Sequence, residues 1–147
     1  FTAAIVVRSP GQPLQAVDAY VDFDPDLLQV VDAGAGSAGI QVTPGPDLPE
    51  VLWNQVDNTL GHIDYAAGIT LGTGAITGTI TVATVRFRCL APIPGAGTAL
   101  AFAFDAPAVR ESLVAFEGTD VLAAHEDGVA CRPVMRLRLP MIRKGNS

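Results

Sequence analysis

Three aspartates at alternate positions give this sequence its nearest approach to a metal-binding motif. They are Asp22, Asp24 and Asp26. Carboxylates at this spacing begin the calcium loop of an EF-hand. The match ends there, because Leu27 stands where that loop needs glycine and Ala33 where it needs a bidentate carboxylate. The sequence therefore requires no cofactor, although it leaves open a calcium site with a loop carboxylate such as Asp57 as ligand.

Phosphate-binding and hydrolytic motifs are equally incomplete. Residues 34–39 (GAGSAG) match the GxGxxG pattern, but that loop must open a helix and the following Pro44-Gly45-Pro46 prevents one. A catalytic triad could be drawn only from Ser112, His125 and Asp127, without the strained elbow that activates a serine. We therefore expect no catalytic residue, no metal ligand set and no enzyme.

Composition points to a β-rich domain. The chain has 147 residues, of which 49% are apolar and 16% charged, with 15 Gly and 11 Pro. The apolar residues come in short runs divided by turn residues, and no run approaches the roughly 18 residues of a membrane span. The net charge of -6 argues against a nucleic-acid partner, since phosphate binding depends on clustered Lys and Arg.

The elements that would position functional side chains are strands. We expect them over 1–8, 17–23, 29–32, 50–56, 62–67, 79–90, 98–104, 112–116 and 128–134, with a short one at 40–42. The run from Val17 to Phe23 alternates strictly, which places Asp18, Tyr20 and Asp22 on the outer face. We expect a turn at 9–13, a capped helical turn after Asp24, and a β-bulge between residues 82 and 85. The fold class is all-β: a nine-stranded or eight-stranded antiparallel jelly-roll β-sandwich, immunoglobulin-like.

One domain is expected over residues 1–134, followed by a basic tail or linker at 135–147. The chain has two cysteines, Cys89 and Cys131, and both lie in strand-like runs. A disulfide between the sheets and a pair of buried thiols both fit this placement.

Four segments in order resemble the cohesin modules of cellulosome scaffoldins and related secreted proteins. They are 19–31 (AYVDFDPDLLQVV), 56–68 (VDNTLGHIDYAAG), 76–88 (ITGTITVATVRFR) and 127–129 (DGV). The resemblance implies a jelly-roll sandwich without catalysis. It also implies a partner, the dockerin, which is a small calcium-loaded helical module on another protein.

In the family, the dockerin binds one flat sheet face built from the third, fifth, sixth and eighth strands. Carried over by position, the resemblance implies a partner-binding set that comprises Asp18, Tyr20 and Asp22 from the third strand, His62, Asp64 and Ala66 from the fifth, and Thr84 and Arg86 from the sixth. Asp18 is the strongest candidate, because family members commonly place an Asp or Asn there that reaches the dockerin.

The sequence also departs from the family. Residues 1–8 match the second family strand, so the first has no counterpart and a sheet edge is left open. We expect residues 135–139, or a neighbouring chain in a homodimer, to cover part of this edge. The leading interpretation is a secreted or cell-surface module for protein–protein recognition.

The alternative is a carbohydrate-binding or purely structural β-sandwich of a multidomain surface protein. Sugar-binding jelly rolls use a flat row of exposed aromatic rings. Most aromatic residues here are predicted to point inward, namely Phe23, Tyr65, Phe87, Phe102 and Phe104. Only Tyr20 and Trp53 remain for a polysaccharide.

Overall fold

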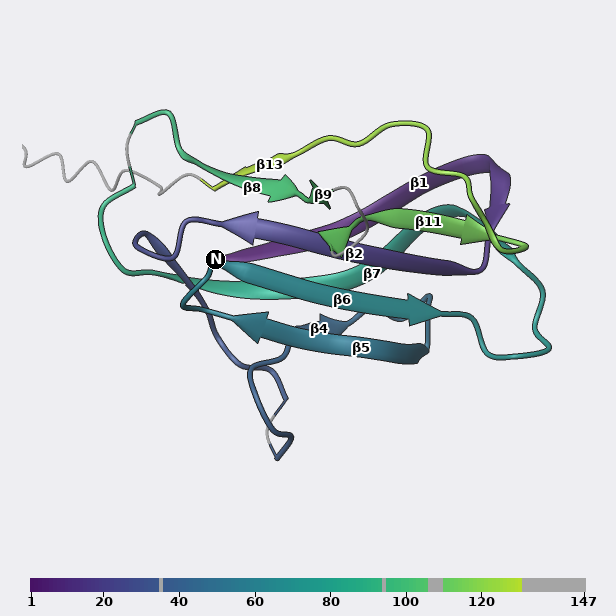
Figure 1. Ribbon diagram of the computed structural model, residues 1–147, viewed down its shortest axis with the longest axis horizontal. Coiled ribbons are helices and arrows are strands. Elements are labelled where there is room, and N and C mark those ends of the chain that lie inside the picture. The colour runs from purple at the N-terminus through teal and green to yellow at the C-terminus, as the bar shows by residue number, and fades with distance from the viewer. Residues whose placement is uncertain (35, 94, 106–109, 131–147) are drawn as a thin grey trace, which may run out of the picture.

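The protein is an antiparallel β-sandwich, which confirms the predicted fold class. The computed structural model describes residues 1–34, 36–93, 95–105 and 110–130, and these form thirteen strands in two main sheets and one small hairpin (Figure 1). The expected number was eight or nine, and the excess comes from four strands of two residues each: β4 (Thr43–Pro44), β9 (Phe104–Asp105), β10 (Arg110–Glu111) and β12 (Thr119–Asp120). Within these ranges no helix is long and apolar enough to cross a membrane.

The first sheet is built around β7 (Ile76–Cys89), which pairs with β1 (Thr2–Leu14), β3 (Leu28–Val30) and β4 (Thr43–Pro44). The expected bulge in β7 is confirmed: Ile5 pairs with Ala83 while Val6 pairs with Thr81, so Val82 is the extra residue. The turn expected at 9–13 is wrong, because β1 continues through it. An irregular register between Ser9 and Leu14 absorbs the prolines there, which an edge strand tolerates.

The second sheet has seven strands and carries the candidate site. Its main order is β12 (Thr119–Asp120), β11 (Leu113–Phe116), β2 (Ala16–Phe23), β6 (His62–Gly68) and β5 (Glu50–Asp57). The first half of β2 pairs with β11 and its second half with β8 (Thr98–Phe102), which in turn pairs with β13 (Gly128–Ala130). Figure 1 shows β2, β6 and β5 as successive neighbours.

A small hairpin leaves this sheet where β8 and β11 meet. It consists of β9 (Phe104–Asp105) and β10 (Arg110–Glu111). Ser112 contacts β2 at the point where the hairpin leaves the sheet. Its hydroxyl accepts from the N–H of Tyr20 and donates to the C=O of Tyr20, both at 3.1 Å. The Ser112 side chain thus bonds to the backbone of β2 beside Ala103, whose N–H also donates to the C=O of Tyr20 at 2.8 Å.

The core lies between the sheets and follows the predicted alternation of β2. Its largest fully buried side chains are Tyr65, Leu14, Leu28, Leu48, Ile63, Val82 and Val85. One inward prediction is wrong: Phe104 is exposed and packs on the ring of His125, with centroids 4.4 Å apart, while Ala103 is buried. The alternation inverts there because the chain leaves the sheet at Ala103 to form the hairpin.

Two polar turns fix the ends of β2 and β6. The Asp24 carboxylate accepts from the N–H of Asp26 at 2.9 Å, which confirms its capping role, although the turn is short and β3 begins already at Leu28. Gly61 has φ 73°, and a Cβ there would lie 2.0 Å from the carbonyl oxygen of Phe23. Only glycine fits this position.

The sandwich is open beside β1. In the part of the chain that the structure describes, β1 pairs with β7 alone, and a cleft of about 810 Å³ lies between the sheets along it. The prediction that residues 135–139 cover this edge falls outside the described residues. So does the state of Cys131, and with it the question of a disulfide to Cys89.

Candidate functional site

The outer face of the seven-stranded sheet is the candidate site, and its strand register decides which side chains meet there. Ala66 lies opposite Asp18 on one side and Trp53 on the other, and Asp18 lies opposite Leu113. Directly opposed residues of antiparallel strands share a face. We call this set the Trp53 row, and it runs across β5, β6, β2 and β11 as Trp53, Ala66, Asp18 and Leu113.

Two further rows lie beside the Trp53 row on the same face. The first joins Gln55, Asp64 and Tyr20, and the second joins Asp57, His62 and Asp22. The face therefore combines apolar, aromatic and acidic side chains over neighbouring strands. Six of the eight sequence-predicted binding residues lie on it, namely Asp18, Tyr20, Asp22, His62, Asp64 and Ala66.

Thr84 and Arg86 do not share this face, and their predicted placement is wrong. Both lie on β7 in the opposite sheet, where Thr84 pairs with Ala4 and Arg86 with Thr2. Val85 between them is buried, so their side chains point away from the core on the far side of the sandwich. The strand that completes the face is β5.

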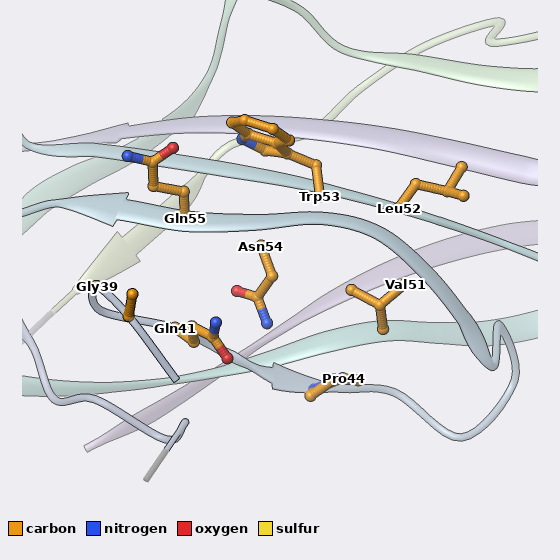
Figure 2. A pocket seen from close by; sticks show the side chains of 9 residues that line it. Gly39, Gln41, Pro44, Val51, Leu52, Trp53, Asn54 and Gln55 are labelled. Carbon is orange, nitrogen blue, oxygen red and sulfur yellow. The ribbon is translucent and has the colours of Figure 1, made fainter. Parts of the chain in front are cut away.

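Sequence reasoning did not assign Trp53 to this face. A bulge between Val51 and Trp53 makes Leu52 the extra residue of β5, so Leu52 and Trp53 follow one another without the usual alternation. Figure 2 shows Leu52, Trp53 and Gln55 on one side of β5, and Val51 and Asn54 on the other. Trp53 is 54% exposed and Leu52 is 65% exposed.

Asp18 is the carboxylate of the Trp53 row. It is half-buried between the alanine of β6 and Leu113 of β11, and desolvation by burial raises the pKa of its carboxyl group above the ordinary value. No side-chain hydrogen bond or ion pair of Asp18 is found within the described ranges. A partly desolvated carboxylate without a partner is a strong acceptor for a donor brought by another molecule.

Arg110 of β10 holds two further carboxylates of the face, those of Asp64 and Asp22. Its Nε lies 2.8 Å from an oxygen of Asp64, its Nη1 contacts an oxygen of Asp22, and its guanidinium carbon lies 5.7 Å from the ring centre of Tyr20. The side chain of Arg110 is only 12% exposed. We call Arg110, Asp22 and Asp64 the Arg110 clamp.

The pKa values of groups in and around the Arg110 clamp are also shifted. Burial alone would lower the pKa of Arg110, but its hydrogen bonds to Asp22 and Asp64 raise it above the ordinary value. Burial, followed by the nearby charges of Asp18 and Asp64, raises the pKa of Tyr20. Nε2 of His62 lies 3.8 Å from Asp22, at the edge of the clamp.

The motifs that suggested other chemistry have separate structural roles. Ser112 is bonded to the backbone of Tyr20, Asp127 accepts from the N–H of Phe102 at 2.9 Å, and His125 packs on Phe104. The Asp57 carboxylate accepts from the N–H groups of Thr59 and Leu60.

No group of three or more His, Cys, Asp or Glu side chains suited to a metal occurs among the described residues. A shallow hollow of about 560 Å³ borders β5, lined by residues such as Gln41, Pro44 and Asn54. Figure 2 shows Trp53 on the opposite side of β5 from Asn54. The amide of Asn54 is already bonded to the N–H and C=O of Val42, both at 2.9 Å.

The fold and this face define a class: the chain has the fold of cohesin domains. A type II cohesin dyad from the adaptor ScaA scaffoldin of Acetivibrio cellulolyticus superimposes with a TM-score of 0.69 at 15% identity, over 92% of this chain and 44% of that one. A single type II cohesin domain from the cellulosome of the same organism gives 0.68 at 16% identity, over 88% and 84%.

The chain thus spans less than half of the dyad and most of the single domain. No protein-family model matches the sequence, and no curated protein sequence matches it significantly. The similarity is therefore one of fold.

Proposed function

We propose that this chain is a non-catalytic protein–protein recognition module that binds a dockerin on the outer face of its seven-stranded sheet. The observation that carries the proposal is the Trp53 row, in which an exposed indole, an alanine and a carboxylate with no side-chain partner among the described residues follow one another across adjacent strands. The cohesin fold supports the choice of partner.

The apolar part of the row suits the centre of an interface. Tryptophan is among the residues most enriched at binding hot spots, and a flat neighbour such as Ala66 lets a helix approach closely. Leu52 adds apolar area next to Trp53. A stable complex buries about 800 Å² on each partner, an area that a helical module laid across several strands can supply.

Asp18 gives the interface its directional contact. Its carboxylate is flanked by apolar neighbours, so a partner that excludes water there strengthens any hydrogen bond it donates. Serine, threonine, asparagine or backbone N–H groups at the end of a helix are suitable donors. We therefore expect Asp18 to fix the register of the partner on the sheet.

The proposal is tested by titrating a panel of purified type I and type II dockerins against the chain, with calcium and with a chelator. We expect calcium-dependent binding to at least one dockerin, and its loss in Asp18→Ala and Trp53→Ala. Leu71→Ala, which removes a 99% exposed leucine from the loop after β6, is the matched control. A panel with no binder, or binding indifferent to both substitutions, contradicts the proposal.

A polysaccharide pull-down in parallel tests the alternative drawn from the sequence. Retention on a glycan that depends on Trp53 but not on Asp18 would favour a carbohydrate-binding module over a dockerin-binding one. We place the module in a secreted or cell-surface protein, as its fold relatives from a cellulosome suggest. The chain itself requires no cofactor in this proposal, and calcium enters with the partner.

A further inference from the structure

Arg110 reaches the candidate face from outside the sheet. It belongs to the β9–β10 hairpin, which branches off between β8 and β11, yet its guanidinium lies against Asp22 of β2 and Asp64 of β6. Its Nη2 also lies 3.4 Å from the carbonyl oxygens of Val21 and Ile63. Contacts to two strands and an exposure of only 12% make Arg110 a built-in part of the face.

The clamp divides the acidic groups of the face into two kinds. Asp22 and Asp64 are bonded to a cation of their own chain, while Asp18 has no such partner among the described residues. Within the described part of the chain, the Trp53 row therefore offers one carboxylate that is not bonded to a side chain and has apolar neighbours. The adjoining part of the face offers an ion cluster in which one oxygen of each aspartate is already bonded to Arg110.

We propose that Arg110 determines the specificity of this face: it satisfies Asp22 and Asp64 from within, so the face selects a partner with an apolar anchor and a single donor for Asp18, and rejects a partner with clustered positive charge. This inference rests on the proposed function for the nature of the partner. The rejection of basic partners follows from the clamp alone.

The physical reason is the state in which a basic partner would leave Arg110. A lysine that took the place of Arg110 on Asp22 or Asp64 would have to displace a guanidinium whose side chain is only 12% exposed, and an unpaired buried charge is strongly unfavourable. A lysine that left the clamp intact would lie close to a like charge. Without Arg110, the two aspartates would instead form an exposed acidic pair that attracts cations.

The test uses a hexalysine peptide as a probe of positive charge, so it needs no dockerin. Arg110→Gln removes the charge and keeps a planar donor of similar shape. Arg88→Gln makes the same change of net charge on β7 in the opposite sheet, where Arg88 is exposed, and is the matched control. Binding is followed by amide chemical shifts of isotope-labelled protein at low and at moderate salt.

We expect Arg110→Gln to bind hexalysine at least about tenfold more tightly than the wild type at low salt, with the largest shifts on β2 and β6, and to lose most of this gain at moderate salt. Arg88→Gln should match the wild type. Arg110→Lys keeps the positive charge even if the substitution shifts the hairpin, so this variant should bind the peptide no more tightly than the wild type does. Equal binding by Arg110→Gln and Arg88→Gln, or tight binding by Arg110→Lys, overturns the inference.

A dockerin that binds the wild type gives a second arm. The affinity of this dockerin for the wild type should depend weakly on salt, because the central contacts are apolar and Arg110 reduces the charge of the clamp from −2 to −1. The affinity of the same dockerin for Arg110→Gln should fall with salt if the binding helix of the dockerin is basic and rise with salt if that helix is acidic. If no dockerin binds at all, the proposed function fails while the hexalysine result still decides the role of Arg110.

Discussion

Trp53 on β5 lies directly opposite Ala66 on β6, so the most exposed large ring of the sheet has one of the smallest side chains as its neighbour. The indole is therefore open to a partner on its β6 side and does not pack against a bulky cross-strand residue. Because of this pairing, one large aromatic side chain projects from an otherwise flat sheet.

Trp53→Ala should weaken the binding of a dockerin by about 2 kcal/mol or more, which is roughly thirtyfold in Kd, because an exposed aromatic anchor is lost. The free energy of unfolding should change by less than about 0.5 kcal/mol, since more than half of the side chain is already in water. Calorimetric titration and urea unfolding measure the two quantities. Leu71→Ala should alter neither, and a large loss of stability in Trp53→Ala would assign the residue to the core.

Asp18→Asn should make the free protein more stable at neutral pH while it weakens partner binding. Burial raises the pKa of Asp18, so the folded state favours the uncharged form. The stability linked to this group is therefore present below the ordinary pKa of 3.8 and lost as pH rises through the raised folded value. An amide carries no charge and avoids that loss.

Urea unfolding of the wild type and Asp18→Asn at neutral pH and at about pH 3 checks this prediction. The gain in stability of the variant should shrink in acid, where the wild-type carboxyl is also neutral. A variant that is less stable than the wild type at neutral pH would show that Asp18 has a stabilising partner inside the chain.

Tyr65→Phe should raise the free energy of unfolding by up to about 1 kcal/mol. The Tyr65 side chain is fully buried, its hydroxyl has no hydrogen-bond partner among the described residues, and burial raises the pKa of the phenol. Removing an unsatisfied buried polar group relieves its desolvation penalty. Urea unfolding measures the effect.

Tyr20→Phe is the matched control for this substitution, because Tyr20 lies half-exposed on the outer face of the same sheet. Its hydroxyl can remain in water, so the control should change stability little. A Tyr65→Phe protein that is clearly less stable would mean that an internal water or another group satisfies the hydroxyl.

Asp57→Asn should make the protein less sensitive to acid. The N–H groups of Leu60 and Thr59 hold the pKa of Asp57 below its ordinary value of 3.8. The stability that this carboxylate contributes is present above the ordinary value and is lost as pH falls through the lowered folded value. Below about pH 4 the wild type should therefore lose more stability than Asp57→Asn, in which the amide oxygen still accepts but does not titrate.

Thermal unfolding in steps between about pH 7 and pH 2 gives the comparison. Asp26→Asn, which replaces another exposed turn carboxylate, is the matched control for the loss of one negative charge. Parallel curves for the wild type and Asp57→Asn would show that the turn bonds of Asp57 do not contribute to acid stability.

The sequence predicts the middle of the second sheet well because local periodicity controls it. The strict alternation from Val17 to Phe23 assigns each residue to a face, and the register of β2 with β6 preserves that assignment. The slip at Val82 is also visible locally, since a bulge breaks the alternation at one position. In each case the information lies within a few consecutive residues.

Long-range features of the site could not be read in this way. The family resemblance assigns Thr84 and Arg86 to the wrong sheet, and alternation cannot correct this assignment, because it separates inward from outward side chains but does not show which sheet a strand joins. Trp53 follows a bulge, so the pattern of β5 has no clean period. Arg110 contacts Asp22, which lies 88 positions earlier in the sequence, and no local sequence pattern indicates such a contact.

The bulge at Leu52 has a further consequence for the protein before it meets a partner. An outer strand with exposed Val51, Leu52 and Trp53 is the kind of segment through which chains stack into aggregates. Here the bulge interrupts the regular edge, while the segment at 40–42 engages it through a bond from the N–H of Val56 to Ile40 at 2.9 Å and through the side chain of Asn54. Trp53 can therefore stay exposed to water, while the edge of β5 is not regular enough to pair with a strand of another chain.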